Sequence, residues 1–453
     1  MKKKILASLL VIALILSSFT MVACGNGDGD VADVASDDAT DVAEDAGGEN
    51  EEEGPDLDQY TSEDEKEIIF WNLWGGGDGV VLQEMVEYFN ENNPDGIRVI
   101  SLTQDWGMYY TKLRTAVVGN QAPDLAMSHV TRIYELATNQ VIVPLDEAFA
   151  QAGLSVDFNQ ITSGVMENSI IDGVYYGLPV DNLILTLQFN KEVLESTGFL
   201  GDDGQPLIGN NFEDFVDVLT SIEEQGYIAL QAYQTGFMTQ IVWYTLYKQL
   251  GGTRFLADDL QSVELDYDLA VLAAEYLSEL YSFTPPHVET NATLFAEGNT
   301  AFMIDGSWAV SSIAALIDDF GVVKFPQFFD NNLIWTDSHA FVLPNKPQRT
   351  ENETRYALIF VQWFHDNSWK WAEAGHLPAN TASWEHPQFI ANEFVHAYSD
   401  AGNYGVAFPS TDSVWLTFAA EFSEPFEALV NEGADPEETI DLMIRNLDRE
   451  LSR

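Results

Sequence analysis

The sequence is poor in cysteine and in positive charge, and its main part has no long hydrophobic run. Its single cysteine, Cys24, excludes an internal disulfide and a metal site built from several cysteines. Only 19 lysines and arginines stand against 73 aspartates and glutamates, so the formal net charge is −54. Nucleic acid phosphates would be repelled by such a chain, which excludes nucleic acid as a partner. The same acidity is typical of proteins that face a saline medium, where salt screens self-repulsion.

Familiar catalytic motifs are also missing. The sequence has no nucleophile elbow, no HExxH helix and no phosphate loop with its lysine. With 73 acidic residues, two carboxylates suited to glycoside hydrolysis would occur by chance, so their presence is no evidence. We therefore expect a protein that is not an enzyme and that has neither a cofactor nor a metal. A secreted glycoside hydrolase is the alternative, and a purely structural adhesin is a third possibility.

Residues 1–24 are typical of a secretory signal peptide. Three lysines precede an apolar run from Ile5 to Leu16, which is too short to cross a bilayer. The segment Met21-Val22-Ala23-Cys24-Gly25 resembles the lipobox of bacterial lipoproteins, in which the cysteine becomes the lipid-bearing N-terminus. We expect lipid attachment at Cys24 and a location on the outer side of the cell membrane, or in the periplasm.

Residues 25–66 form an acidic segment rich in Asp, Glu, Gly and Ala. Such a composition cannot bury enough apolar surface to fold, and its like charges repel one another. We expect a disordered tether that holds the folded part away from the membrane. Calcium binding by Asp28 and Asp30 is the alternative, but no complete calcium-loop spacing follows them.

The remaining 67–453 region is long enough for two lobes. Its first part predicts strands at 67–74, 97–102 and 123–128 that alternate with helices at 80–90, 109–119 and 132–139. This alternation favours an α/β fold with a parallel sheet, whose ligand-binding loops follow the strands along one edge. Residues 177–190 predict an extended crossing segment, the pattern is mainly helical from about 212, and 301–305 predict a buried strand.

Several short motifs, in order, resemble the family 1 extracellular solute-binding proteins, the carbohydrate-binding components of ABC importers related to maltose-binding protein. The matching segments are 70–77 (FWNLWGGG), 110–113 (YTKL), 121–126 (QAPDLA), 176–179 (YGLP), 189–191 (FNK), 295–303 (FAEGNTAFM), 306–308 (GSW) and 374–378 (AGHLP). The resemblance implies a two-lobe periplasmic-binding-protein-like fold, with sheets flanked by helices and joined by crossing hinge segments. It also implies capture of a sugar or oligosaccharide and its delivery to an importer permease. We expect a monomer.

The domain boundaries follow from these patterns. We expect the first part of the N-terminal lobe at 67–180 and the second lobe at 181–453. Within the latter, the chain should return to the first lobe around 295–345 and end in a C-terminal helical segment.

A sugar offers apolar faces to aromatic rings and hydroxyls to directed polar groups. Trp74, Trp106 and Trp308 stand beside Gly or Asp at expected ligand-edge loops, and Trp243 with Tyr244 lies in an aromatic-rich run; core packing is the alternative for each. The expected polar partners are Asp78, Asp105, His129, Asp181, Asn182, His339 and His376. Asp105 has helix capping as its alternative role. The glycine loop at 75–79 suits close approach of a neutral sugar better than a phosphate, since no basic residue follows until Arg98.

Overall fold

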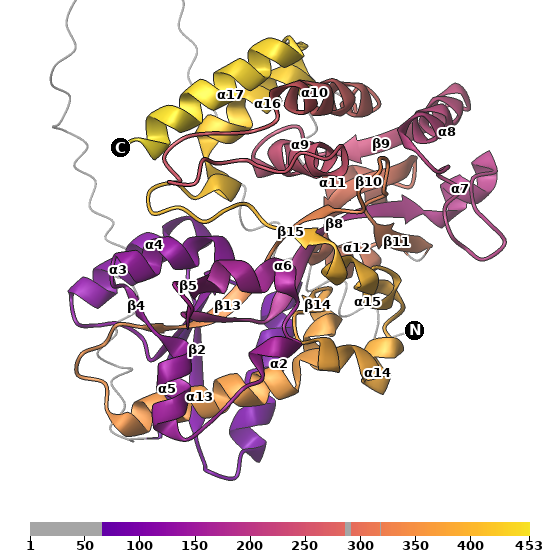
Figure 1. The fold of residues 1–453 in the computed structure, drawn as a ribbon. Coiled ribbons are helices and arrows are strands. Elements are labelled where there is room, and N and C mark those ends of the chain that lie inside the picture. Colours follow the sequence, from indigo (N-terminus) through magenta and orange to yellow (C-terminus); the bar gives the residue numbers. More distant parts are fainter. Residues whose placement is uncertain (1–65, 286–290, 318) are drawn as a thin grey trace, which may run out of the picture. The chain divides into compact units, whose positions relative to one another are not determined.

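A computed structural model describes residues 66–285, 291–317 and 319–453 (Figure 1). The predicted signal peptide, Cys24 and all but the last residue of the predicted tether lie outside the described residues. The described chain forms two large sheets with separate hydrophobic cores, which helices cover, and a small two-stranded sheet of β5 (Ile170–Ile171) and β6 (Val174–Tyr175). The predicted α/β fold class is therefore confirmed. Among these residues, no helix combines the length and the apolar character needed to cross a bilayer.

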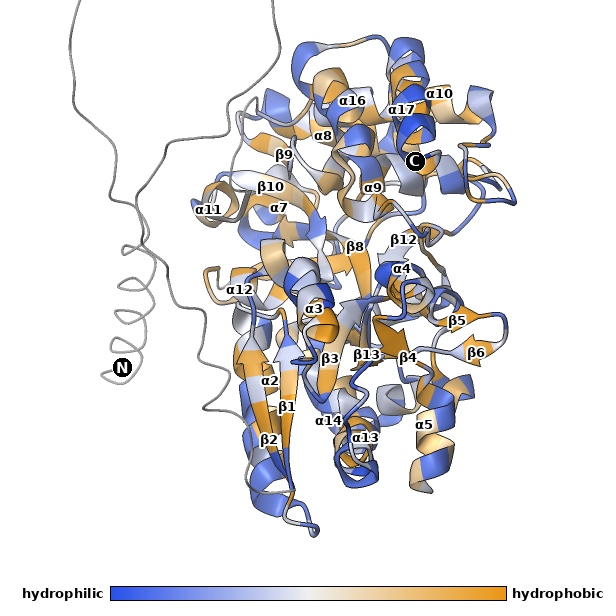
Figure 2. Ribbon diagram, turned by 90° about the vertical axis from the view of Figure 1, so that its left-hand side faces the viewer, coloured by the Kyte–Doolittle hydropathy of each residue, from blue (hydrophilic) through white to orange (hydrophobic). Residues whose placement is uncertain are grey.

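The first sheet has the strand order β2-β1-β3-β13-β4, with β7 also paired to β13. Its strands β1 and β2 are mainly hydrophobic in Figure 2; four of the six residues of β1 are buried, whereas Val99 is the buried residue of the edge strand β2. β1 runs parallel to β2 and β3, whereas β13 is antiparallel to β3. The strands and the main helices of this core are β1 (Glu67–Asn72), β2 (Arg98–Thr103), β3 (Leu125–His129), β4 (Ile142–Val143), β7 (Gly177–Pro179), β13 (His339–Pro344), α2 (Gly77–Asn92), α3 (Tyr109–Val118), α4 (Ile133–Thr138), α5 (Leu145–Ala152), α6 (Ser163–Met166) and α13 (Glu351–Asp366).

The second sheet has the order β15-β12-β8-β10-β9, with β11 and β14 also paired to β8. The long strand β8 is buried at every position, because it pairs on both edges and is covered on both faces. The elements of this core are β8 (Asp181–Asn190), β9 (Ile228–Ala232), β10 (Thr300–Gly306), β11 (Phe320–Lys324), β12 (Ile334–Asp337), β14 (Leu377–Pro378), β15 (Gly405–Val406), α7 (Lys191–Thr197), α8 (Phe212–Glu224), α9 (Phe237–Gln249), α10 (Tyr267–Tyr281), α11 (Asn291–Ala296), α12 (Val310–Ala314), α14 (Pro387–Ile390), α15 (Glu393–Ala397), α16 (Ala420–Glu432) and α17 (Pro436–Leu451).

The chain crosses between the sheets at three places that lie together. β7 leads into β8 through Val180, β12 leads into β13 through Ser338, and β14 brings the segment after α13 onto β8. The Val180 amide donates to His339 O at 2.8 Å, and the Ala379 amide donates to Val180 O at 3.1 Å. The return to the first sheet thus comes with β13, whereas β10, β11 and β12 pair in the second sheet.

Helix α9 is buried on all sides. Every residue from Met238 to Gln249 is buried, which is typical of a central helix rather than a surface helix. Helices α10 and α16 and strand β12 pack around it. Trp243 lies at the middle of this helix with no exposed surface.

Asp305 in β10 makes stability depend on pH. The residue is 2% exposed, and its carboxylate accepts a hydrogen bond from the Gly306 amide at 2.7 Å. Burial raises the pKa of Asp305 to about 7, because the charged form loses its hydration. A carboxyl whose pKa is raised on folding stabilises the protein below the pKa of the unfolded chain, and that stabilisation is lost as pH rises through about 7.

We therefore expect Asp305→Asn to gain stability relative to the wild type as pH rises. The difference in free energy of unfolding between the two proteins should shift in favour of the variant by about 2 kcal/mol between about pH 5 and about pH 8. Urea denaturation of both proteins at the two pH values measures this shift. A difference that does not change with pH would mean that Asp305 is ionised in the folded protein at both values.

Candidate functional site

A cavity of about 360 Å³ lies between the two cores. Its size is at the lower end of the range of small-ligand pockets, and its surface is mainly aromatic with a few polar groups. The described lining contains no lysine or arginine. The lining residues are Leu73, Trp74, Asp78, Trp106, His129, Leu183, Phe237, Trp308, Trp335, Asp337, His339, His376, Thr417 and Phe418.

The first sheet supplies one wall through the ends of its parallel strands. Trp74 follows β1, Trp106 follows β2, and His129 is the last residue of β3. Because parallel strands end at the same sheet edge, three residues far apart in sequence reach one cavity. Trp74 is nearly buried and packs on Trp371 with ring centroids 4.6 Å apart. Trp106 is 43% exposed, so its ring offers the larger free surface.

The opposite wall comes from the second core. Trp308 follows β10, and its ring lies 6.0 Å from Phe237 and 6.3 Å from Trp335, between centroids. A Cβ added to Gly306 would come within 2.1 Å of the Trp308 ring. The missing side chain at Gly306 therefore allows the indole to lie against the backbone of its own turn.

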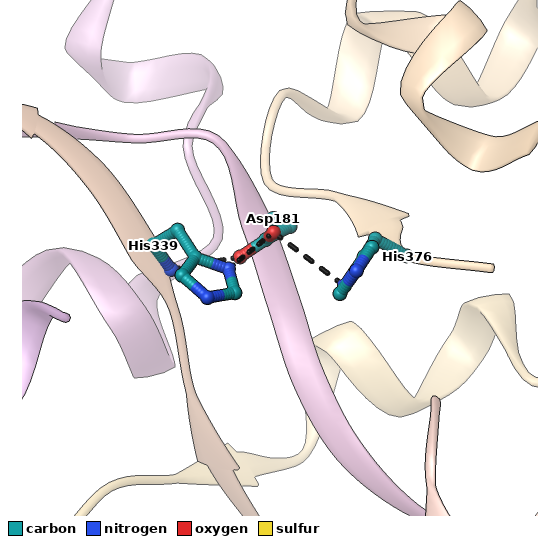
Figure 3. A group of neighbouring side chains, drawn as sticks. All are labelled: Asp181, His339 and His376. Carbon is teal, nitrogen blue, oxygen red and sulfur yellow. Dashed lines mark hydrogen bonds and ion pairs between the residues drawn. The ribbon is translucent and has the colours of Figure 1, made fainter. Parts of the chain in front are cut away.

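Asp181, His339 and His376 form a buried polar cluster at the crossing segments (Figure 3). The Asp181 carboxylate accepts hydrogen bonds from the His339 amide at 2.8 Å and from Trp371 Nε1 at 3.0 Å, and its Oδ2 lies 2.8 Å from His339 Nδ1. His376 Nδ1 lies 3.6 Å from the same oxygen, and His376 Nε2 lies 3.6 Å from Asp78 Oδ2. The cluster joins all three crossings by side-chain contacts.

The electrostatics of the cluster favour charged Asp181. Burial alone would raise its pKa, but the charge and hydrogen bond of His339 and the charge of His376 lower that pKa to about 2. The pKa of His339 is raised in return, since Asp181 outweighs the effect of burial. Burial and the neighbouring His339 hold the pKa of His129 well below its usual value, so His129 stays neutral. Its Nδ1 lies 2.7 Å from the Tyr110 hydroxyl.

Two acidic residues of the lining, Asp78 and Asp337, have pKa values shifted in opposite directions. Burial would raise the pKa of Asp78, but the neighbouring His376 and His339 lower it. Burial raises the pKa of Asp337 to about 6, against the effect of hydrogen bonds from Ser338 and Thr131. The Asp337 carboxylate accepts from the Ser338 amide and from Thr131 Oγ1, both at 2.8 Å. Asp337 is thus held in place from within the protein.

Seven of the predicted ligand-binding residues line this cavity: Trp74, Asp78, Trp106, His129, Trp308, His339 and His376. Asp181 lies beneath the lining, where it fixes His339. Asn182 turns away, as its carbonyl oxygen accepts from Thr162 Oγ1 at 2.7 Å. Asp105 accepts from the Met108 amide at 3.1 Å and caps a short 3₁₀ helix, the alternative role expected for it.

Trp243 and Tyr244 lie in the core rather than in the cavity lining. Trp243 Nε1 donates to Ala270 O at 3.0 Å, and the Tyr244 hydroxyl donates to Ala407 O at 3.1 Å. The Trp243 N–H and the Tyr244 O–H are therefore both hydrogen-bonded inside the protein. Both rings pack among phenylalanines. Their position in helix α9 explains this, because that helix has no exposed face.

Several lining residues were not predicted from the sequence. Phe237 begins α9, Trp335 lies within β12, and Phe418 lies in a short 3₁₀ helix before α16. Nothing in the local pattern separates such aromatics from core residues. Asp337 could have been predicted as a lining residue, because it stands two positions before His339, which was itself predicted.

Among proteins of known function, the chain is similar to a maltotriose-binding protein of Pyrococcus abyssi. The two are 20% identical over 360 residues, which cover 77% of this chain and 75% of that protein. It is also similar to an arabinooligosaccharide-binding protein of Halalkalibacterium halodurans, with 24% identity over 264 residues, 53% of this chain and 54% of that protein.

The fold is shared with solved structures. The structure of UgpB from Mycobacterium tuberculosis, in complex with glycerophosphocholine, matches with a TM-score of 0.71 at 18% identity and covers 85% of this chain and 98% of that chain. A likeness at this identity concerns the fold alone. The family model for the bacterial extracellular solute-binding proteins matches residues 84–434, most of the folded region. The chain therefore belongs to the bacterial extracellular solute-binding proteins.

Proposed function

We propose that the protein captures a sugar or oligosaccharide outside the cell and delivers it to an ABC importer. The observation that carries this proposal is the lining of the cavity, in which aromatic rings face directed carboxylates and imidazoles. Aromatic rings suit the apolar faces of a sugar, and the polar groups suit its hydroxyls. The named ligands of the two similar proteins, maltotriose and arabinooligosaccharides, support the same class.

The ligand we propose is neutral. A phosphate would need positive charge, and no lysine or arginine is among the described lining residues. The cavity volume of about 360 Å³ suits a short ligand, or one part of a longer chain. A ligand that touches Trp106 on one core and Trp308 on the other would stabilise a closed arrangement by its extra contacts.

A thermal-shift screen against monosaccharides and oligosaccharides tests the proposal. We expect a rise in melting temperature with at least one sugar, because a ligand that binds only the folded protein stabilises it. Calorimetry with that sugar should give one ligand per chain. If no sugar shifts the melting temperature, carbohydrate binding is contradicted.

Glycoside hydrolysis, the alternative expected from the sequence, is not supported by the matched family or by the two similar proteins, which are binding proteins. The observation in its favour is that two carboxylates, those of Asp78 and Asp337, line the cavity. Against it, hydrogen bonds within the protein hold the Asp337 carboxylate. Product analysis after incubation with the bound oligosaccharide separates the two functions. Repeated turnover would favour the hydrolase, and recovery of intact sugar would favour the binding protein.

The lipid anchor on Cys24 and the monomeric state are also proposals. An acidic tether of residues 25–66 would let the folded part reach the permease while the lipid stays in the membrane. We expect Cys24→Ser to abolish incorporation of labelled fatty acid and to release the protein into the medium. Incorporation that persists in this variant would contradict lipid attachment at Cys24.

A further inference from the structure

His376 is buried without completing its hydrogen bonds. It has no exposed surface, and neither ring nitrogen has a hydrogen-bond partner. Its ring stacks on Trp371, with centroids 5.1 Å apart and planes 6° apart, so its orientation is fixed. A buried polar group without a hydrogen bond costs about 1–3 kcal/mol. Such a group in a folded protein indicates that something else satisfies it.

His376 lies between two carboxylates. One nitrogen, Nδ1, faces Asp181 Oδ2 at 3.6 Å, and the other, Nε2, faces Asp78 Oδ2 at 3.6 Å. Both distances are too long for a hydrogen bond. On the far side of Asp181 lies His339, whose Nδ1 is 2.8 Å from the same Oδ2 (Figure 3). Two imidazoles from different crossing segments thus lie on either side of one carboxylate, with one ligand atom of each residue within 4.8 Å of the others.

We propose that Asp181, His339 and His376 bind a divalent transition-metal ion such as Zn²⁺. One ligand atom from each residue lies within 4.8 Å of the others. Ligand atoms at about 2.0–2.2 Å from a tetrahedral ion stand about 3.3–3.5 Å apart, so shifts of about 1 Å would close the site. Imidazole and carboxylate are ligands that zinc accepts readily, and three protein ligands leave a fourth position open.

Asp78 fits this site as the outer partner of a ligand. When Nδ1 of His376 binds the ion, its Nε2–H points at Asp78 Oδ2. A metal-bound histidine usually donates its second N–H to such a carboxylate. Asp78 is itself held, because its Oδ1 accepts from the Gly76 and Gly79 amides at 3.2 and 2.9 Å. Asp78 and Asp181 together supply the negative charge that balances a divalent ion.

The alternative partner for His376 is a hydroxyl of the bound sugar. A hydroxyl in the cavity can reach His376 and His339, which line it, but Asp181 lies beneath them. A hydroxyl also leaves unexplained why a buried carboxylate stands between two imidazoles. Because His339 and His376 both line the cavity, a sugar oxygen could fill the fourth position; only this last extension rests on the proposed function.

Zinc titration of the full chain by calorimetry tests the site, without sugar. The titrated protein carries Cys24→Ser to remove the thiol, and excess Mg²⁺ occupies surface carboxylates. We expect one Zn²⁺ per chain and a rise in melting temperature. His376→Phe keeps the stacked ring and removes both nitrogens, so it should abolish the one-to-one binding. His396→Ala, which removes an exposed histidine in α15, should leave it unchanged.

Asp78→Asn gives an independent measurement in a variant whose buried cluster is intact. Loss of an outer partner should weaken zinc binding by about 10- to 100-fold without abolishing it. The proposal is overturned if wild-type protein binds no zinc under these conditions, or if His376→Phe and Asp78→Asn both bind it as wild type does. Sugar binding in chelator, measured separately by thermal shift, would then leave the proposed function standing.

Discussion

Replacing Trp308 by alanine should weaken sugar binding by about 1–3 kcal/mol, or about 5- to 150-fold in Kd. Trp308 lines the cavity from the second core, and its ring is only partly buried without ligand. A sugar face laid on the indole would remove apolar surface from water on both partners. Calorimetry with the sugar found in the thermal-shift screen measures the change.

Two further variants separate contact with the ligand from damage to the fold. Trp369→Ala removes another partly buried tryptophan that stacks on His386 and does not line this cavity, so sugar affinity should be unchanged. Gly306→Ala should lower the affinity by displacing the Trp308 ring, because its Cβ would meet the indole at 2.1 Å. In the Trp308→Ala background, Gly306→Ala should have no further effect. Equal affinity of Trp308→Ala and wild type would remove Trp308 from the site.

Local patterns predicted the elements of the first sheet well. The expected strand at 97–102 and helix at 109–119 correspond to β2 (Arg98–Thr103) and α3 (Tyr109–Val118). Each is encoded by alternating or helically spaced apolar residues within one short segment. The pairing of β13 with β3 could not be predicted in this way. It joins His339 to His129, 210 positions apart, and depends on how the two cores meet.

The predicted residues that follow strand ends lie together in the structure. Trp74, Trp106 and His129 were placed at the ligand edge by topology alone, and all three line the cavity. The role of a residue that depends on its burial could not be predicted from the sequence. The sequence around Asp181 gives no sign that His339 and Trp371 enclose its carboxylate. These contacts come from residues 158 and 190 positions away.

The same limit applies to tryptophans. Trp243 and Trp308 were both expected at the ligand, yet one is in the core and the other lines the cavity. The difference lies in the helix around Trp243, which is covered on every side by α10, α16 and β12. The only sign of this burial in the sequence is that the run around Trp243 has no polar face.

Trp243→Ala should destabilise the protein by about 3–5 kcal/mol, since it removes the largest side chain type from a fully buried position. The indole stacks parallel to Tyr247, with planes 6° apart, and contacts Phe426 at 4.9 Å between ring centroids. Its removal leaves a cavity among these rings and the Ala270 carbonyl without its donor. Urea denaturation of variant and wild type measures the loss.

Trp243→Phe provides the second measurement if the alanine variant does not fold. Phenylalanine refills part of the space but lacks the Nε1–H, so a smaller loss of stability is expected. Sugar affinity of this variant should equal that of wild type at temperatures where both are folded, in contrast with Trp308→Ala. Because the two tryptophans belong to the same core, a fall in affinity for Trp243→Phe would show that packing in α9 controls the cavity wall formed by Phe237 at the start of that helix.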